Sequence, residues 1–122
     1  MEKILLIVLD WNLRQLYHEL LLTRNLEVTP IDSIEDAIVL LSLGQFETIV
    51  LYTDEQSHNQ VLTLLRLRKK YPRWQNLKFI ILSADSDAFR QELNEADLII
   101  NPLLDSPVQV TDKIKKFIND TI

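Results

Sequence analysis

Polar side chains follow several short apolar runs of this 122-residue chain and could do chemistry if the fold gathers them. Asp10 comes directly after Ile4–Leu9, Ser83 closes a later apolar run, and Asn101 follows the last one. A serine becomes a nucleophile only when a base activates it, and no histidine stands near Ser83 in the sequence. We therefore expect no catalytic triad and no enzyme.

The composition excludes several other kinds of site. The absence of cysteine excludes disulfides, thiolate nucleophiles and cysteine-ligated metal centres. The single glycine, Gly44, excludes the glycine-rich loops that bind phosphate groups. His18 and His58 are far apart in the sequence and lack the i, i+4 spacing of a helical metal pair. We expect no metal centre.

Charge and hydropathy limit the partners. A net charge of −5 disfavours nucleic acid, although the segment Arg66–Trp74 combines cations with aromatic rings that could stack on bases. Because cations also stabilise the carboxyl end of a helix, we favour a structural or protein-contact role for this segment. The longest apolar runs, of about six residues, are far below the ~20 that span a membrane, and the amino terminus does not resemble a signal peptide. We expect a soluble, cytoplasmic protein that binds neither nucleic acid nor membrane.

Apolar and amphipathic segments alternate along the chain. Near-continuous apolar runs predict buried parallel strands, and a Pro-terminated run predicts an edge strand. The predicted strands are Ile4–Leu9, Leu26–Pro30, Thr48–Tyr52, Phe79–Leu82 and Leu98–Ile100. Five helices are predicted between and after them. Asn12 is expected to cap the first, and the second opens with the capping pair Asp32 and Glu35 and ends near Gly44. The third covers Gln60–Lys70, the fourth Ser86–Asn94, and the fifth has Ser106 as cap and Pro107 at its first position.

This alternation predicts one α/β domain over residues 1–122. The edge character of the strand ending at Pro30 favours a flavodoxin-like, doubly wound parallel sheet of order 2-1-3-4-5. In such sheets the ligand crevice lies at the carboxyl ends of the first and third strands, which is where we expect the functional site.

Four segments together resemble the receiver domain of two-component response regulators, as in CheY-like proteins: Ile4–Asp10, Phe46–Tyr52, Ile80–Ala84 and Asn101–Pro102. The resemblance covers nearly the whole chain. It implies that the first strand should supply two acids for Mg²⁺, the third a phosphoacceptor aspartate, the fourth a hydroxyl and the fifth a lysine.

The chain departs from that pattern at three of the five positions. Leu9 replaces the first acid, Tyr52 the phosphoacceptor and Asn101 the lysine, whereas Asp10 and Ser83 are retained. A phenol is neutral near pH 7, since its pKa is about 10, and one carboxylate binds a hard cation poorly. We therefore predict a degenerate receiver, or pseudo-receiver, that acts as a phosphorylation-independent protein-protein interaction module without a cofactor, with at most weak Mg²⁺ binding at Asp10. We expect Asn101 to hydrogen-bond Asp10 or a nearby backbone group.

The alternative is a phosphoacceptor that uses Asp54 with Asp10 and Mg²⁺. Asp54 stands two positions beyond Tyr52, and side-chain alternation would point both the same way if the strand continued.

The resemblance also implies partners and an interface. A histidine kinase or an output domain is the expected signalling partner. Receiver domains often associate through their fourth helix, fifth strand and fifth helix, which here predicts a homodimer interface. Its predicted residues are Arg90, Asp97, Leu98, Lys113 and Lys116.

Overall fold

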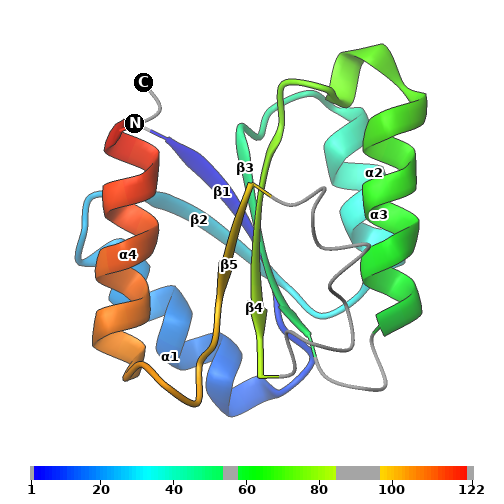
Figure 1. Ribbon diagram of the computed structural model, residues 1–122. Helices are drawn as coiled ribbons and strands as arrows, with labels where there is room; N and C mark the ends of the chain where they lie inside the picture. Colours follow the sequence, from blue (N-terminus) through cyan, green and yellow to red (C-terminus); the bar gives the residue numbers. More distant parts are fainter. Residues whose placement is uncertain (1, 54–57, 85–96, 121–122) are drawn as a thin grey trace.

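Five parallel strands form one sheet in the computed structural model, which describes residues 2–53, 58–84 and 97–120 (Figure 1). The strands lie in the order β2-β1-β3-β4-β5, and every neighbouring pair is parallel. Their bounds are β1 Lys3–Ile7, β2 Glu27–Ile31, β3 Thr48–Thr53, β4 Lys78–Ser83 and β5 Leu98–Ile100. The predicted flavodoxin-like sheet and its strand order are confirmed.

Helices cover both faces of the sheet. Helices α1 and α4 lie on one side, and α2 and α3 lie on the other (Figure 1). The described residues contain four α-helices and one 3₁₀ helix, α1 Trp11–Leu22, α2 Ile34–Ser42, α3 His58–Lys70, η1 Pro72–Trp74 and α4 Pro107–Asp120. Five α-helices were predicted, and the one over Ser86–Asn94 falls outside the described residues.

The strands bury side chains on both faces. In β1, Leu5 and Ile7 belong to the apolar cluster under α2 and α3, whereas Ile4 and Leu6 belong to the cluster under α1 and α4. Successive side chains of a strand point to opposite faces, so a strand covered on both sides needs an uninterrupted apolar run. This requirement explains why the runs in the sequence identified the strands.

The second strand lies at an edge, as its proline predicted. Strand β2 pairs with β1 alone, and Pro30 stands opposite Leu6 in that pair. Proline has no backbone N–H to donate, which an edge strand tolerates because one of its sides has no neighbour in the sheet.

Two of the predicted helix caps are wrong. Helix α1 is capped by Asp10 and not by Asn12, and α2 by Ser33 and not by Asp32. Both true caps have extended backbone and side chains that accept hydrogen bonds from amides of the first turn. The predicted start of α4 is confirmed, since the Ser106 hydroxyl accepts from the Gln109 amide and the Gln109 side chain accepts from the Ser106 amide.

None of the helices in the described ranges combines the length and apolar composition that crossing a bilayer requires.

Candidate functional site

The parallel sheet brings the five predicted site positions to one edge. Leu9 and Asp10 follow β1, Tyr52 and Ser83 lie at the ends of β3 and β4, and Asn101 follows β5. The register places Tyr52 beside Leu82 and Thr53 beside Ser83. These residues therefore border the crevice where open α/β sheets bind ligands.

A pair of tyrosines occupies the end of β3. Tyr52 packs on the α1 and α4 side of the sheet, with its ring centroid 6.1 Å from that of the buried Tyr17 on α1 and the two planes inclined by 45°. Burial, and secondarily the neighbouring Tyr52 phenol, raises the pKa of Tyr17 to about 12. The position that the resemblance gives to a phosphoacceptor thus holds a phenol packed against a second phenol.

Asp10 has a structural task at the crevice. Its Oδ1 accepts a hydrogen bond from the Leu13 backbone amide at 2.9 Å, which caps α1. The Arg14 guanidinium donates to the carbonyl of Val8 at 2.8 Å and to that of Leu9 at 3.3 Å. The carboxylate and the guanidinium on this side of the crevice therefore both bind backbone groups that join β1 to α1.

The remaining positions are polar but uncharged. Ser83 and its register partner Thr53 are buried. The Asn101 amide nitrogen donates to the carbonyl of Ala84 at 3.4 Å, and its side-chain oxygen accepts from the Leu103 amide at 2.9 Å. Of the two hydrogen-bonding alternatives predicted for Asn101, the structure shows the bond to a nearby backbone group.

The described residues of the crevice do not fit Mg²⁺. This cation takes near-octahedral oxygen ligands and is usually held by one or two carboxylates together with phosphate oxygens. Here Leu9 is apolar, and one oxygen of Asp10 already accepts an amide hydrogen bond. Across residues 2–53, 58–84 and 97–120, no group of three His, Cys, Asp or Glu side chains could hold a metal ion. Asp54, the alternative phosphoacceptor, lies outside the described residues.

Exposed apolar side chains lie in the connections after β1 and β5 and in the first turns of α1 and α4, and sequence reasoning missed them as a group. The β1–α1 and β5–α4 connections both lie at the carboxyl end of the sheet (Figure 1). Trp11 is 62% exposed and Leu104 is 81% exposed. We call this set of exposed residues the apolar rim: Leu9, Trp11, Leu103, Leu104 and Val108. The signal for it in the sequence was the occurrence of large apolar residues within turns.

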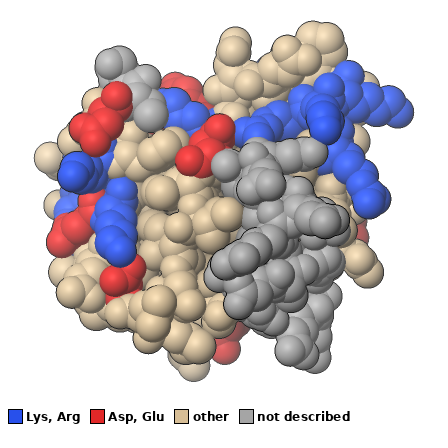
Figure 2. Space-filling model, viewed as in Figure 1, with Lys and Arg blue, Asp and Glu red and all other residues tan. Residues whose placement is uncertain are grey.

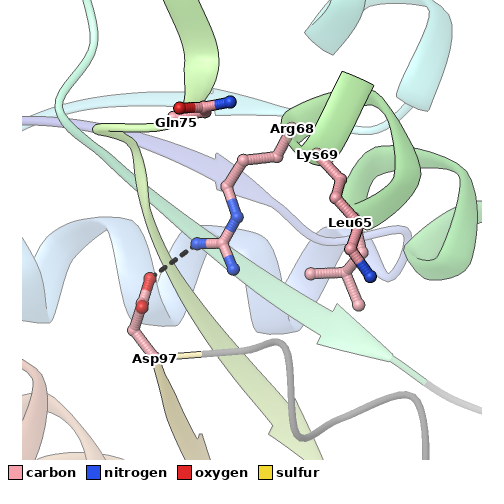
Figure 3. Close-up of a pocket in the computed structure, with 5 residues that line it drawn as sticks. All are labelled: Leu65, Arg68, Lys69, Gln75 and Asp97. Atoms are coloured by element: carbon pink, nitrogen blue, oxygen red, sulfur yellow. Dashed lines mark hydrogen bonds and ion pairs between the residues drawn. The ribbon is translucent and has the colours of Figure 1, made fainter. Parts of the chain in front are cut away.

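The predicted interface residues that the structure describes contact different parts of the chain. Asp97, just before β5, accepts from the Arg68 guanidinium of α3 at 2.7 Å (Figure 3). It also accepts from the Phe79 amide at 2.7 Å. Leu98 packs partly against the core under α1 and α4. Lys113 forms an ion pair with Asp105, and Lys116 is exposed on α4. Arg90 lies outside the described residues, so the homodimer interface stays a prediction.

The pocket drawn in Figure 3 lies away from the crevice. It has a volume of about 370 Å³ and is lined by Leu65, Arg68, Lys69, Gln75 and Asp97, between the end of α3 and the start of β5. The starts of parallel strands are at the opposite edge of the sheet from their carboxyl ends, so this pocket and the crevice are separate.

Solved structures with the same fold include a sensor protein and several response regulators. A sensor protein from Polaromonas sp. JS666 superposes with a TM-score of 0.79 at 14% identity, over 99% of this chain and 98% of that one. A chain of the complex between the histidine kinase ThkA and the response regulator TrrA, a Thermotoga maritima protein, gives 0.75 at 23% identity, over 95% and 97%. Chemotaxis protein CheY4 of Vibrio cholerae gives 0.74 at 16% identity, over 95% and 98%.

No family model and no curated protein matches the sequence. The similarity to solved structures therefore establishes the fold: the chain folds as a CheY-like receiver domain does, over nearly its whole length.

Proposed function

We propose that this chain is a pseudo-receiver, a signalling domain that binds a partner protein and takes no phosphate at the end of β3. The observation that carries the proposal is the packing of Tyr52 against Tyr17 at the position where a receiver needs an ionised aspartate. The receiver fold places this position, and the side chain at it supplies the chemistry.

The crevice lacks the charges that phosphoryl transfer uses. An acyl phosphate forms when a carboxylate attacks phosphorus while a metal ion and a cation neutralise the phosphoryl oxygens. Tyr52 offers a neutral phenol near pH 7, Leu9 offers no metal ligand, and Asn101 offers an amide in place of an ammonium group. Because Asn101 replaces the lysine where the acids are also replaced, no unpaired ammonium group is left among neutral residues at these positions, which would be costly if buried.

The partner surface of the proposal is the apolar rim. Large exposed apolar patches on a domain mark contact sites for other proteins. The complex of a histidine kinase with a response regulator among the similar structures supports a signalling protein as the partner. The rim lies at the same end of the sheet as the crevice, so a partner bound there covers Tyr52 and does not need phosphate to recognise the domain.

Intact mass measurement after incubation with acetyl phosphate and Mg²⁺ tests the absence of phosphoryl transfer. We expect the chain to keep its mass while an active receiver domain in the same tube gains one phosphoryl group. An adduct that appears on this chain and is lost in Asp54→Asn would instead establish the alternative phosphoacceptor and overturn the proposal.

Binding to purified histidine-kinase dimerisation domains from the same genome tests the partner surface. We expect a kinase domain to bind without phosphate, and Leu104→Ser to weaken binding by at least about ten-fold, which corresponds to 1.4 kcal/mol. Leu22→Ser, which removes an exposed apolar side chain at the last residue of α1, away from the carboxyl end of the sheet, is the matched control and should change nothing. Equal loss in both variants would contradict a contact at the rim.

A further inference from the structure

We propose that a groove between α2 and the α3–η1 junction binds an acidic partner segment that carries a bulky apolar side chain. This basic-rimmed groove lies on the opposite face of the sheet from the proposed rim contact, so it is a second interaction surface. Residues that line it are Ile38, Ser42, Leu67, Tyr71, Arg73 and Trp74.

The groove has the size and lining for a large apolar side chain. Its volume is about 520 Å³, and four of its six lining residues are apolar or aromatic. One wall is formed by Ile38 and Ser42, which are one turn apart on α2. Beside them, Val39 is 64% exposed and Leu43 is also exposed, which extends the apolar surface outward along α2.

Aromatic rings form the opposite wall. Tyr71 is 42% exposed and stands edge-on to the buried ring of Trp74, with centroids 5.4 Å apart. The Trp74 indole Nε1 is the one buried side-chain polar atom among the described residues that has no hydrogen-bond partner. An unsatisfied buried donor of this kind costs roughly 1–3 kcal/mol.

Cations lie at the edge of the groove: Arg73 lines it, and Lys70 lies over the ring of the lining residue Tyr71. The sequence holds no acidic residue from position 56 to position 84, although the chain as a whole is acidic. Figure 2 shows Lys and Arg gathered over the end of α3 and the segment after it. Arg66, Lys70 and Arg73 form no ion pair with any residue in the described ranges. Lys70 and Arg73 instead lie over the rings of Tyr71 and Trp74, at 5.6 and 5.7 Å from the ring centroids.

The arrangement of rings and cations selects an acidic segment of protein over nucleic acid. Base recognition on aromatic platforms needs an open ring face, whereas Trp74 is buried and Arg73 covers its ring. Stabilisation of the helix end accounts for Lys69 and Lys70, but not for Arg73, which lies beyond α3. Nor does it account for the exposed apolar wall on α2. Carboxylates for the cations and an apolar side chain for the groove satisfy both features.

Tryptophan fluorescence gives a direct readout, because the chain has two tryptophans and one lines the groove. Trp11→Phe leaves Trp74 as the single reporter. The probe is a peptide of about twelve residues rich in aspartate and glutamate, with a leucine and a phenylalanine four positions apart. We expect this peptide to shift the Trp74 emission with a saturable curve whose apparent Kd rises with salt.

Three competitor probes define the specificity. A peptide whose leucine and phenylalanine are replaced by serine, a lysine-rich peptide with both apolar residues, and an oligothymidine should each bind at least about ten-fold more weakly. The proposal is overturned if the acidic peptide leaves Trp74 emission unchanged up to millimolar concentration. It is also overturned if the serine peptide or the oligothymidine binds as tightly as the acidic peptide.

Charge-reversal variants at the groove and on the distant helix α4 form a matched pair that tests whether the acidic peptide binds locally. The Lys70→Glu, Arg73→Glu double variant should weaken the acidic peptide by at least about ten-fold. Lys116→Glu changes an exposed cation on α4 across the sheet and should leave the Kd within about two-fold. Lys70→Ala with Arg73→Ala gives the same direction with less disturbance of the end of α3. Equal effects of the α3–η1 and α4 variants would refute a local site.

Failure here and failure of the pseudo-receiver proposal are separate results. The groove experiment uses no phosphate, metal or kinase. A phosphorylated Asp54 would overturn the pseudo-receiver proposal but would not contradict the proposed binding at the groove.

Discussion

The two ends of the sheet differ in the charge and the exposure of their side chains. At the carboxyl ends of the strands, Tyr52, Ser83 and Asn101 are neutral, and exposed leucines lie in the connections after β1 and β5. At the amino ends, charged side chains pair across the chain, as Arg68 does with Asp97 and Lys78 does with Glu2.

This difference concerns the end of the sheet at which parallel α/β folds usually bind their ligands. Open α/β sheets bind ligands at their carboxyl ends, where an ionic site would be expected. Among the described residues, the carboxyl end presents packed phenols and the apolar rim, whereas Arg66, Lys70 and Arg73, which form no ion pair with a described residue, lie near the end of α3, on the opposite face and toward the other end.

The largest expected effect comes from placing the same acidic residue at both regions. Tyr52→Asp removes a ring packed on Tyr17 and puts a carboxylate against apolar neighbours, so we expect the free energy of unfolding to fall by roughly 2–4 kcal/mol. Tyr71→Asp alters a partly exposed ring and should cost under about 1 kcal/mol. Urea unfolding of both variants measures the contrast, and equal costs would show that the crevice is not packed as described.

The free energy of unfolding at alkaline pH should report the burial of the Tyr17 phenol and so sharpen the contrast. The pKa of Tyr17 is raised to about 12 in the folded state, whereas an exposed phenol ionises near 10. Below pH 10 both states keep the proton and this contribution is complete. Between pH 10 and 12 the unfolded state releases the proton first, so stability falls as pH rises.

Comparison with a variant that cannot ionise isolates this contribution. From pH 9 to pH 11 the chain should lose about 1.4 kcal/mol more of its free energy of unfolding than Tyr17→Phe does. Urea unfolding at the two pH values measures the difference. Identical pH dependence of the two proteins would argue against burial of this hydroxyl.

The smallest expected effect separates capping from charge at Asp10. Asp10→Ala should cost about 1 kcal/mol because the Leu13 amide loses its acceptor, whereas Asp10→Asn keeps an acceptor and should cost only a few tenths. Ser106→Ala at the cap of α4 is the matched control, with a loss of similar size. Thermal unfolding with and without MgCl₂ measures all four proteins. Mg²⁺ should shift none of them, and a Mg²⁺ shift lost in Asp10→Asn would point to a metal ligand.

The sheet could be read from the sequence because its physical cause is local. Strands buried on both faces require apolar runs, and Pro30 tolerates an edge position, so both the strands and their order followed. Caps were less certain because several polar residues stand within two positions of each helix start. The backbone angles between β1 and α1 make Asp10, and not Asn12, the cap of α1. These angles cannot be derived from the sequence.

Contacts between distant segments could not be read from the sequence. The contacts of Asp97 with Arg68, 29 positions earlier, and with the Phe79 amide were not predicted, while its place in an interface stays a prediction. In the sequence, the aromatic rings of the basic segment could have stacked on bases. In the fold, Trp74 is buried. The groove itself needs α2 and α3 side by side, and neither helix alone indicates it.

The edge position of Pro30 also limits how copies of this domain can assemble. An open sheet edge is a template for another strand, and natural proteins protect such edges against domain swapping and fibre growth. Here one outer strand carries a residue that cannot donate, and the other, β5, is three residues long. Sheet extension from one molecule to the next is disfavoured at both borders, so recognition between chains has to rely on side-chain surfaces.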